Sequence, residues 1–153
     1  MPDIDRLGYN FRMSDIQAAI GIVQLAKLDR FIDERDVWAR WYAKHLADIP
    51  WLRCPVVPEG FRHAWQAYVV VVDADSAPCS RNEMMSHLEA RGIATRPGTH
   101  AITELGYYRE TRGLPAGCCP VASMLDAQSI AIPLHNRMTR EDYEHVMAAL
   151  HAL

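Results

Sequence analysis

The sequence predicts an α+β fold, in which a long N-terminal helical arm precedes a small sheet covered by helices. Three observations support this prediction. Helical periodicity runs from residue 14 to residue 47, two Val- and Ile-rich segments at 67–75 and 129–134 have the composition of strands, and capped helical segments separate and follow them. Half of the 153 residues are hydrophobic and 23% are charged, which favours a packed core over disorder.

The first helix of the arm is expected to begin after Ser14. Gln17 follows three residues later, and this S-x-x-Q spacing predicts a capping box that satisfies two otherwise unpaired backbone N–H groups. Ile16, Ile20 and Val23 then fall at helical spacing, interleaved with small residues that permit close approach by a neighbour.

A second helical stretch runs from Leu28 to Ala47, and Pro50 ends it. A bend is expected near residues 27–29, because two helices of ordinary length fit this pattern better than one of more than thirty residues. Its apolar contacts are predicted to come from Ile32, Trp38, Trp41, Tyr42 and Leu46.

Residues 54–66 form a Pro- and Gly-punctuated connection that leads into the strongest strand signal, residues 67–75. Four consecutive valines there fit a strand buried on both faces, or on one face with a close neighbour. Residues 92–98 predict a short strand that Pro97 ends, and residues 129–134 predict a second buried strand.

The remaining segments are predicted to be mostly helical. Ser80 and Glu83 form a second capping box for a helix through Arg91, and Gly92 stands where a left-handed C-terminal cap is expected. Residues 100–117 are irregular, with one helical turn around residues 107 and 108, and residues 119–127 predict a short helix. Thr139 caps the last helix, whose apolar stripe comprises Tyr143, Val146, Met147 and Leu150.

Composition excludes several classes of function. The net charge of −3 provides no general attraction to nucleic acid or to an anionic membrane, and the longest apolar run is too short to span a bilayer. The four cysteines show no C-x-x-C or Cys/His spacing, so no metal site is expected. The adjacent Cys118 and Cys119 fit a half-buried helix start better than redox chemistry. We expect a reduced, cytoplasmic protein.

Standard catalytic motifs are missing from the sequence, so no catalytic residue is assigned. It contains neither a Gly-rich phosphate loop nor a G-x-S-x-G nucleophile motif. Acidic residues are scattered along helices, where a solvated face explains them better than catalysis does.

Polar residues just before the first helix are candidates for binding an anion. Asn10 and Arg12 precede a helix N-terminus, where free N–H groups and a partial positive charge favour phosphate, and Arg12 could add a bidentate contact. Alternatively, Asn10 forms a turn and Arg12 pairs with Asp3, Asp5 or Asp15.

Other candidates stand at predicted strand ends, where binding sites are often built. Arg96 and His100 lie in a loop that leaves a strand, His63 and Trp65 precede one, and His135 follows one. Each histidine taken alone is better explained as a surface residue or as one with satisfied hydrogen bonds than as a site residue.

Four stretches together resemble a known family. "LGYNFRMSDIQAAIGIVQLAKLDRFI" closely resembles the signature that follows the cofactor-lysine region in DegT/DnrJ-type nucleotide-sugar aminotransferases, which are fold-type I, PLP-dependent enzymes. "HAWQAYVVVV", "LEARGIATRPGTH" and "SIAIPLHNRMTREDYEHV" follow in the family's order. The resemblance implies the C-terminal portion of such an enzyme, with the arm at residues 1–50, a small, mostly antiparallel α/β domain at residues 51–153, and no large PLP-binding domain.

The resemblance also implies site residues. The family's Asn in this motif reaches across a homodimer to the PLP phosphate of the partner subunit, and Asn10 matches it. Arg12 matches an Arg that faces the substrate side of the same neighbouring site. The remaining substrate-side residues implied by the resemblance are Tyr9, Arg96, His100, His63 and His135.

The departure from the family concerns lysine. Family members hold PLP as a Schiff base on a lysine upstream of this motif, whereas the only lysines here, Lys27 and Lys44, lie in helical runs. The complete homodimeric enzyme is expected to move an amino group, typically from glutamate, to a keto-sugar nucleotide in surface-polysaccharide or glycosylated-metabolite biosynthesis. This chain alone is expected to be inactive. The alternative is a stand-alone, non-catalytic module for dimerisation or sugar-nucleotide binding.

Overall fold

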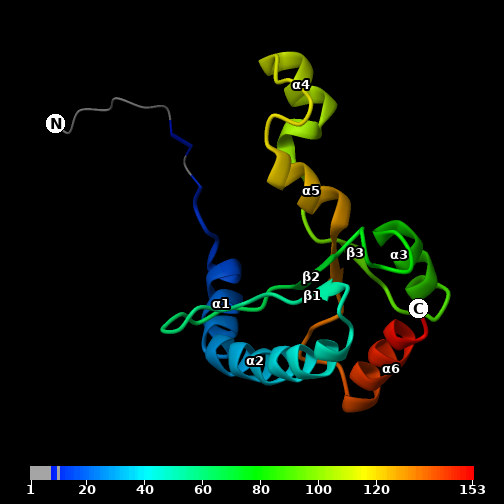
Figure 1. The fold of residues 1–153 in the computed structure, drawn as a ribbon. Helices are drawn as coiled ribbons and strands as arrows, with labels where there is room; N and C mark the ends of the chain where they lie inside the picture. The colour runs from blue at the N-terminus through cyan, green and yellow to red at the C-terminus, as the bar shows by residue number, and fades with distance from the viewer. Residues whose placement is uncertain (1–7, 10) are drawn as a thin grey trace.

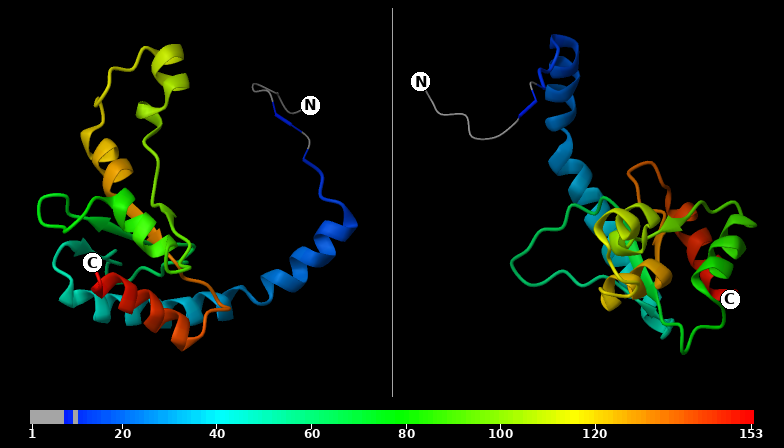
Figure 2. Two further views of the ribbon diagram at one scale, coloured as in Figure 1. Left: turned by 90° about the vertical axis from the view of Figure 1, so that its right-hand side faces the viewer. Right: turned by 90° about the horizontal axis from the view of Figure 1, so that it is seen from above.

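A computed structural model describes residues 8–9 and 11–153. A four-stranded sheet packs against helices α2, α3 and α6, and two projections extend from this body: α1, and a tower formed by α4 and α5 (Figures 1 and 2). The elements are, in chain order, α1 (Asp15–Leu25), α2 (Leu28–His45), η1 (Leu46–Asp48), β1 (Leu52–Arg53), β2 (Tyr68–Val72), α3 (Arg81–Glu89), β3 (Arg96–Pro97), η2 (Ile102–Glu104), α4 (Gly106–Arg112), α5 (Pro120–Gln128), β4 (Ser129–Ile132) and α6 (Arg140–His151).

The sheet has the strand order β1-β2-β4-β3, and every neighbouring pair is antiparallel. The α+β prediction and the mostly antiparallel sheet are therefore confirmed. Along β2, Tyr68, Val70 and Val72 are buried while Val69 and Val71 are only partly buried. The strand therefore has one fully buried face, and its other face is partly covered by a close neighbour. This is the second of the two predicted burial patterns.

The core lies between the sheet and three helices. Tyr42 of α2, Leu88 of α3 and Tyr143 of α6 are fully buried in one hydrophobic cluster with the inward residues of β2 and β4. The Trp38 ring stacks on Tyr143 at 4.0 Å between centroids, and the Tyr42 hydroxyl donates to the Pro133 carbonyl at 2.9 Å. Burial raises the pKa of Tyr143 to about 12.

The helix starts confirm the capping predictions. Ser14 with Gln17, Ser80 with Glu83, and Thr139 with Asp142 each form a reciprocal capping box. Helices α1 and α2 are separate, with the break at residues 26–27, next to the expected bend. Gly92 has a φ of 75°, as a left-handed cap requires.

Three details differ from the sequence predictions. Strand β1 was not expected, the strand predicted in residues 92–98 is only the two-residue β3, which does end at Pro97, and the segment 100–117 contains η2 and the seven-residue α4 in place of a single turn. Pro97 is tolerated because β3 pairs only with β4 and forms a sheet edge, so its missing N–H is not needed by a second neighbour.

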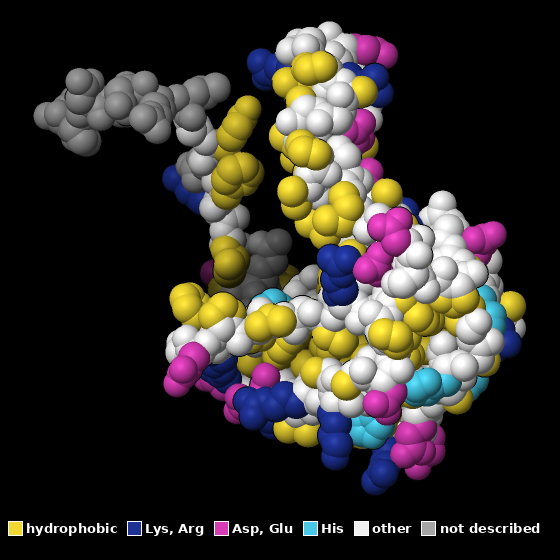
Figure 3. Space-filling view, viewed as in Figure 1, with side chains coloured by type: hydrophobic (Ala, Val, Ile, Leu, Met, Phe, Trp, Pro, Cys, Tyr) yellow, Lys and Arg dark blue, Asp and Glu magenta, His cyan; other side chains and the backbone are white. Residues whose placement is uncertain are grey.

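Both projections expose apolar side chains. No residue of α1 is buried, and Ile16, Ile20 and Ile22 are each more than half exposed. Figure 3 shows hydrophobic side chains along the arm and along the tower, whose exposed members include Tyr107 and Val121. Among the helices of the described residues, none is long and apolar enough to cross a membrane.

Candidate functional site

Three of the predicted site residues line three different hollows. The largest, about 600 Å³, lies between α2 and the segment 55–65 and includes His63. A second, about 250 Å³, lies at the end of the sheet and includes Arg96, and a third, about 420 Å³, includes His135. The second and third hollows adjoin at Ala94 and Pro133. The described part of the chain therefore does not bring these three residues into one pocket.

Arg96 begins the edge strand β3, opposite Ala131, and its side chain is exposed. His100 follows on the loop toward the tower, where its Nδ1 lies 3.4 Å from the carboxylate of Asp126 on α5. Gln66 lines the same hollow as Arg96 and was not among the sequence candidates. Its position directly before the strongest strand was the signal that could have identified it, because strand ends build sites.

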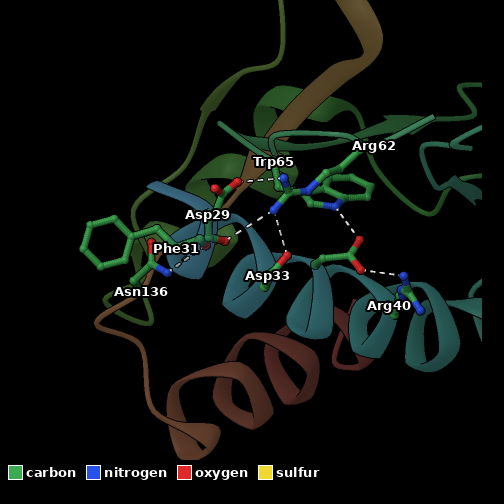
Figure 4. Close-up of polar contacts among 8 residues, drawn as sticks. Asp29, Phe31, Asp33, Arg40, Arg62, Trp65 and Asn136 are labelled. Atoms are coloured by element: carbon green, nitrogen blue, oxygen red, sulfur yellow. Dashed lines mark hydrogen bonds and ion pairs between the residues drawn. The ribbon is translucent and has the colours of Figure 1, made fainter. Parts of the chain in front are cut away.

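His63 lies on a loop that is fastened to α2 through Trp65 (Figure 4). The Trp65 indole N–H donates to Asp36 Oδ1 at 2.9 Å, and the backbone N–H of Trp65 donates to His63 Nδ1 at 2.9 Å. Trp65 is 5% exposed, whereas His63 is exposed and faces the largest hollow.

Arg62 fastens the same loop at a second point. Its guanidinium bridges the carboxylates of Asp29 and Asp33, each at 2.8 Å, and these hydrogen bonds raise the pKa of Arg62. Asp29 and Asp33 are exposed, as a solvated helix face requires, but they also hold the loop. The i, i+4 spacing of Asp29 and Asp33, with Asp36 three residues further, was the available signal, since it aligns the carboxylates on one face.

His135 is exposed, and its Nδ1 accepts from the backbone N–H of Arg137 at 3.2 Å. The next residue, Asn136, connects the segment after β4 to α2. Asn136 accepts from Arg35 Nε at 2.8 Å and donates to the Phe31 carbonyl at 3.0 Å, which ties the segment after β4 to α2.

The residues before α1 occupy the far end of the arm. Tyr9 and Arg12 are exposed, and the Tyr9 and Phe11 rings lie 5.7 Å apart. Arg12 and Asp15 form no ion pair, so only the pairing of Arg12 with Asp15 is tested and it is not observed. Asn10, Asp3 and Asp5 lie outside the described residues.

The lysines do not approach any of the three hollows. Lys27 is the N-cap residue of α2 and Lys44 lies in its last turn, and neither lines the cavities described above. Within residues 8–9 and 11–153, no group of three His, Cys, Asp or Glu residues is arranged to hold a metal ion. Neither lysine amine, the type of group that binds a carbonyl cofactor, lines one of these three hollows.

Cys118 and Cys119 are exposed and form no disulfide. Partial desolvation, together with the neighbouring thiol and Glu104, raises the pKa of Cys118. A raised pKa lowers the fraction of reactive thiolate, which does not favour redox chemistry at this pair.

Sequence comparison gives a family match over nearly the whole chain. Residues 3–151 match the DegT/DnrJ/EryC1/StrS aminotransferase family. The protein MJ1066 of Methanocaldococcus jannaschii is 28% identical over 148 residues, which cover 97% of this chain and 38% of MJ1066.

Solved structures of similar fold are aminotransferases. TlmJ from Streptoalloteichus hindustanus has a TM-score of 0.81 and 27% identity, covering 98% of this chain and 39% of TlmJ. DesV from S. venezuelae, solved in complex with a ketimine intermediate, has a TM-score of 0.84 and 27% identity, covering 97% of this chain and 38% of DesV. The chain thus spans about two fifths of the length of these relatives.

Proposed function

Because this chain belongs to the DegT/DnrJ/EryC1/StrS aminotransferase family, we propose that it supplies part of a PLP-dependent sugar aminotransferase. The complete enzyme transfers an amino group from glutamate to a keto-sugar nucleotide. The observation that carries this proposal is the family match over residues 3–151, which includes the "GYNFRM" sequence directly before the projecting helix α1.

The residues of this chain do not by themselves fit a PLP centre. PLP enzymes of this chemistry need a lysine amine within the cofactor pocket, whereas Lys27 and Lys44 lie on α2 outside the hollows described above. We therefore assign no reaction step to the cofactor in this chain. In this proposal, residues outside this chain supply the lysine and complete the PLP centre. The chain alone is therefore inactive.

We assign the tip of the arm to the neighbouring subunit of a homodimer. Asn10 would hold the PLP phosphate there through a hydrogen bond, and Arg12 would face the substrate beside it. The arm supports this assignment because it extends away from the body, and the side chain of Arg12 is exposed there. Arg is suited to such a role because its guanidinium binds phosphate or carboxylate through two parallel hydrogen bonds.

The sheet end is assigned to the sugar nucleotide. Arg96 is exposed beside a hollow, and His100 stands on the loop that follows, with its ring oriented by Asp126. A cation and an imidazole on one short segment suit the diphosphate and hydroxyl groups of such a substrate.

Spectroscopic titration of the purified chain with PLP tests the proposal. We expect no saturable Schiff-base absorbance and no amino transfer from glutamate, because neither lysine lies in a pocket. Lys27→Ala and Lys44→Ala are the matched controls for nonspecific reaction with surface amines. A Schiff-base band that one of these substitutions abolishes, together with turnover by the unsubstituted chain, would contradict the proposal.

A further inference from the structure

Trp65 has a backbone conformation that its side chain disfavours. Its φ is 48°, and it is the only residue other than glycine with a positive φ within the described part of the chain. Such a conformation is strained for a bulky residue and persists only where the surroundings hold it. The contacts of Trp65 therefore identify what fixes it.

Every polar group of Trp65 is engaged. The indole N–H donates to Asp36 at 2.9 Å, the carbonyl accepts from Arg35 at 3.3 Å, and the backbone N–H donates to His63 Nδ1 at 2.9 Å. Asp36 and Arg35 both belong to α2, so the buried indole anchors the loop to that helix (Figure 4). Arg35 is itself held by Asn136 at 2.8 Å.

The anchored backbone determines which nitrogen of His63 carries a proton. A backbone N–H can only donate, so the ring nitrogen that accepts from it must be unprotonated. Neutral His63 therefore has its proton on Nε2, and this nitrogen is a hydrogen-bond donor. The ring also lies against the indole, with 4.3 Å between centroids, which limits its rotation.

We propose that Trp65 is a positioning residue that, held by Asp36, presents His63 as a fixed Nε2–H donor to the hollow between α2 and the segment 55–65. The Nε2–H group would donate a hydrogen bond to an acceptor oxygen of a ligand, such as a hydroxyl or phosphate oxygen. This proposal rests on the proposed function, in which His63 binds substrate. It adds the residue that orients the His63 ring.

Nitrogen NMR of the histidine rings tests the proposal on this chain without any assay of amino transfer. Histidine is labelled with ¹⁵N, and the His63 signals are assigned by comparison with the His63→Gln variant. Long-range ¹H–¹⁵N correlations are then recorded at a pH at which the ring is neutral. We expect a single tautomer with Nε2 protonated. In Asp36→Ala the indole loses its acceptor, and both ring nitrogen signals should shift toward the averaged values of a freely exchanging histidine.

Two matched variants separate positioning from a general loss of charge on α2. Asp36→Asn retains an oxygen that accepts from the indole and should preserve the wild-type signals. Arg40→Gln removes the 2.6 Å ion pair to the same carboxylate but leaves the indole contact, so it should also preserve them. If Asp36→Ala does not fold by circular dichroism, Trp65→Phe removes the indole N–H together with the pyrrole part of the ring and should cause the same shift.

Three results would overturn the proposal. They are an Nδ1-protonated His63 in the wild type, unchanged signals in the folded variant that lacks the indole contact, and an equal shift in Arg40→Gln. Because none of these depends on turnover, a failed PLP or aminotransferase assay leaves this test intact, and the two proposals fail separately.

Discussion

Gly98 lies immediately after β3, where a side chain would have no room. A Cβ atom built there would approach Val69 Cγ1 to 2.4 Å and Ser129 Oγ to 2.7 Å, closer than packed atoms allow. The glycine therefore lets the chain pass close to the side chains of Val69 on β2 and Ser129 on β4 before it continues to His100. A close approach, and not a turn, requires glycine at this position.

We expect Gly98→Ala to destabilise the protein by about 1–3 kcal/mol, because overpacking forces side chains or backbone to move. Gly106→Ala is the matched control, since no atom lies within 4 Å of its Cβ position and its φ is not positive. Urea unfolding of the two variants checks the prediction, and equal stability of Gly98→Ala and the wild type would contradict it.

At the residue scale, the sequence indicated candidate polar residues but not their partners. His63, Arg96 and His135 stand near strand ends as predicted, yet they lie at different hollows. The contact between Trp65 and Asp36 joins residues 29 positions apart. No local pattern specifies such a pair, because it depends on how the loop after β1 returns across α2.

The helix starts are the elements that the sequence predicted best. A capping box joins residues three positions apart, so Ser80 and Glu83 specify their own geometry. Strand β1 was missed and β3 was predicted too long, because a strand of two residues is defined by its neighbour and not by its composition.

Two of these caps predict how stability responds to acid. The hydroxyl and backbone N–H of Ser80 lower the pKa of Glu83, and hydrogen bonds from Thr139, chiefly its backbone N–H, lower the pKa of Asp142. A carboxylate with a lowered folded-state pKa stabilises the protein above its unfolded pKa, and this contribution is lost as the pH falls through the folded value. Stability should therefore fall as the pH drops below about 4, the ordinary carboxyl range.

Urea midpoints measured across acidic pH test this expectation. Ser80→Ala removes the hydroxyl that bonds Glu83 and should give a shallower loss of stability with acid. Ser76→Ala replaces an exposed serine outside any helix cap and should keep the wild-type slope. An identical pH dependence in Ser80→Ala and the wild type would contradict the assignment of the shift to this cap.

Considering the whole molecule, the body buries its apolar side chains in its own core, whereas the two projections leave theirs exposed. The core cluster joins α2, α3, α6 and the sheet, whereas α1 has no buried residue and the tower exposes apolar side chains. Exposed apolar surface of this kind marks interaction sites in soluble proteins. Helical periodicity predicted α1 correctly, but it could not specify what α1 contacts, because the described chain packs nothing against it.

The central claim is that the arm tip serves the active site of a neighbouring subunit. Grafting this chain in place of the matching segment of TlmJ provides a complete enzyme in which to test it. Asn10→Ala should lower transaminase activity about tenfold or more, because a hydrogen bond to a charged group is lost. Asn82→Ala, an exposed asparagine on α3, is the control and should retain activity. If the TlmJ graft does not fold, the same exchange in DesV replaces it.

Subunit complementation is the most direct measurement. The Asn10→Ala graft is mixed with a graft that keeps Asn10 but lacks the host's Schiff-base lysine, and the subunits are allowed to exchange. If Asn10 acts across the dimer, each mixed dimer contains one intact site, and about a quarter of the wild-type activity should return at equal mixing. If Asn10 acts within its own subunit, no mixed dimer contains an intact site, and the absence of any recovery would contradict the claim.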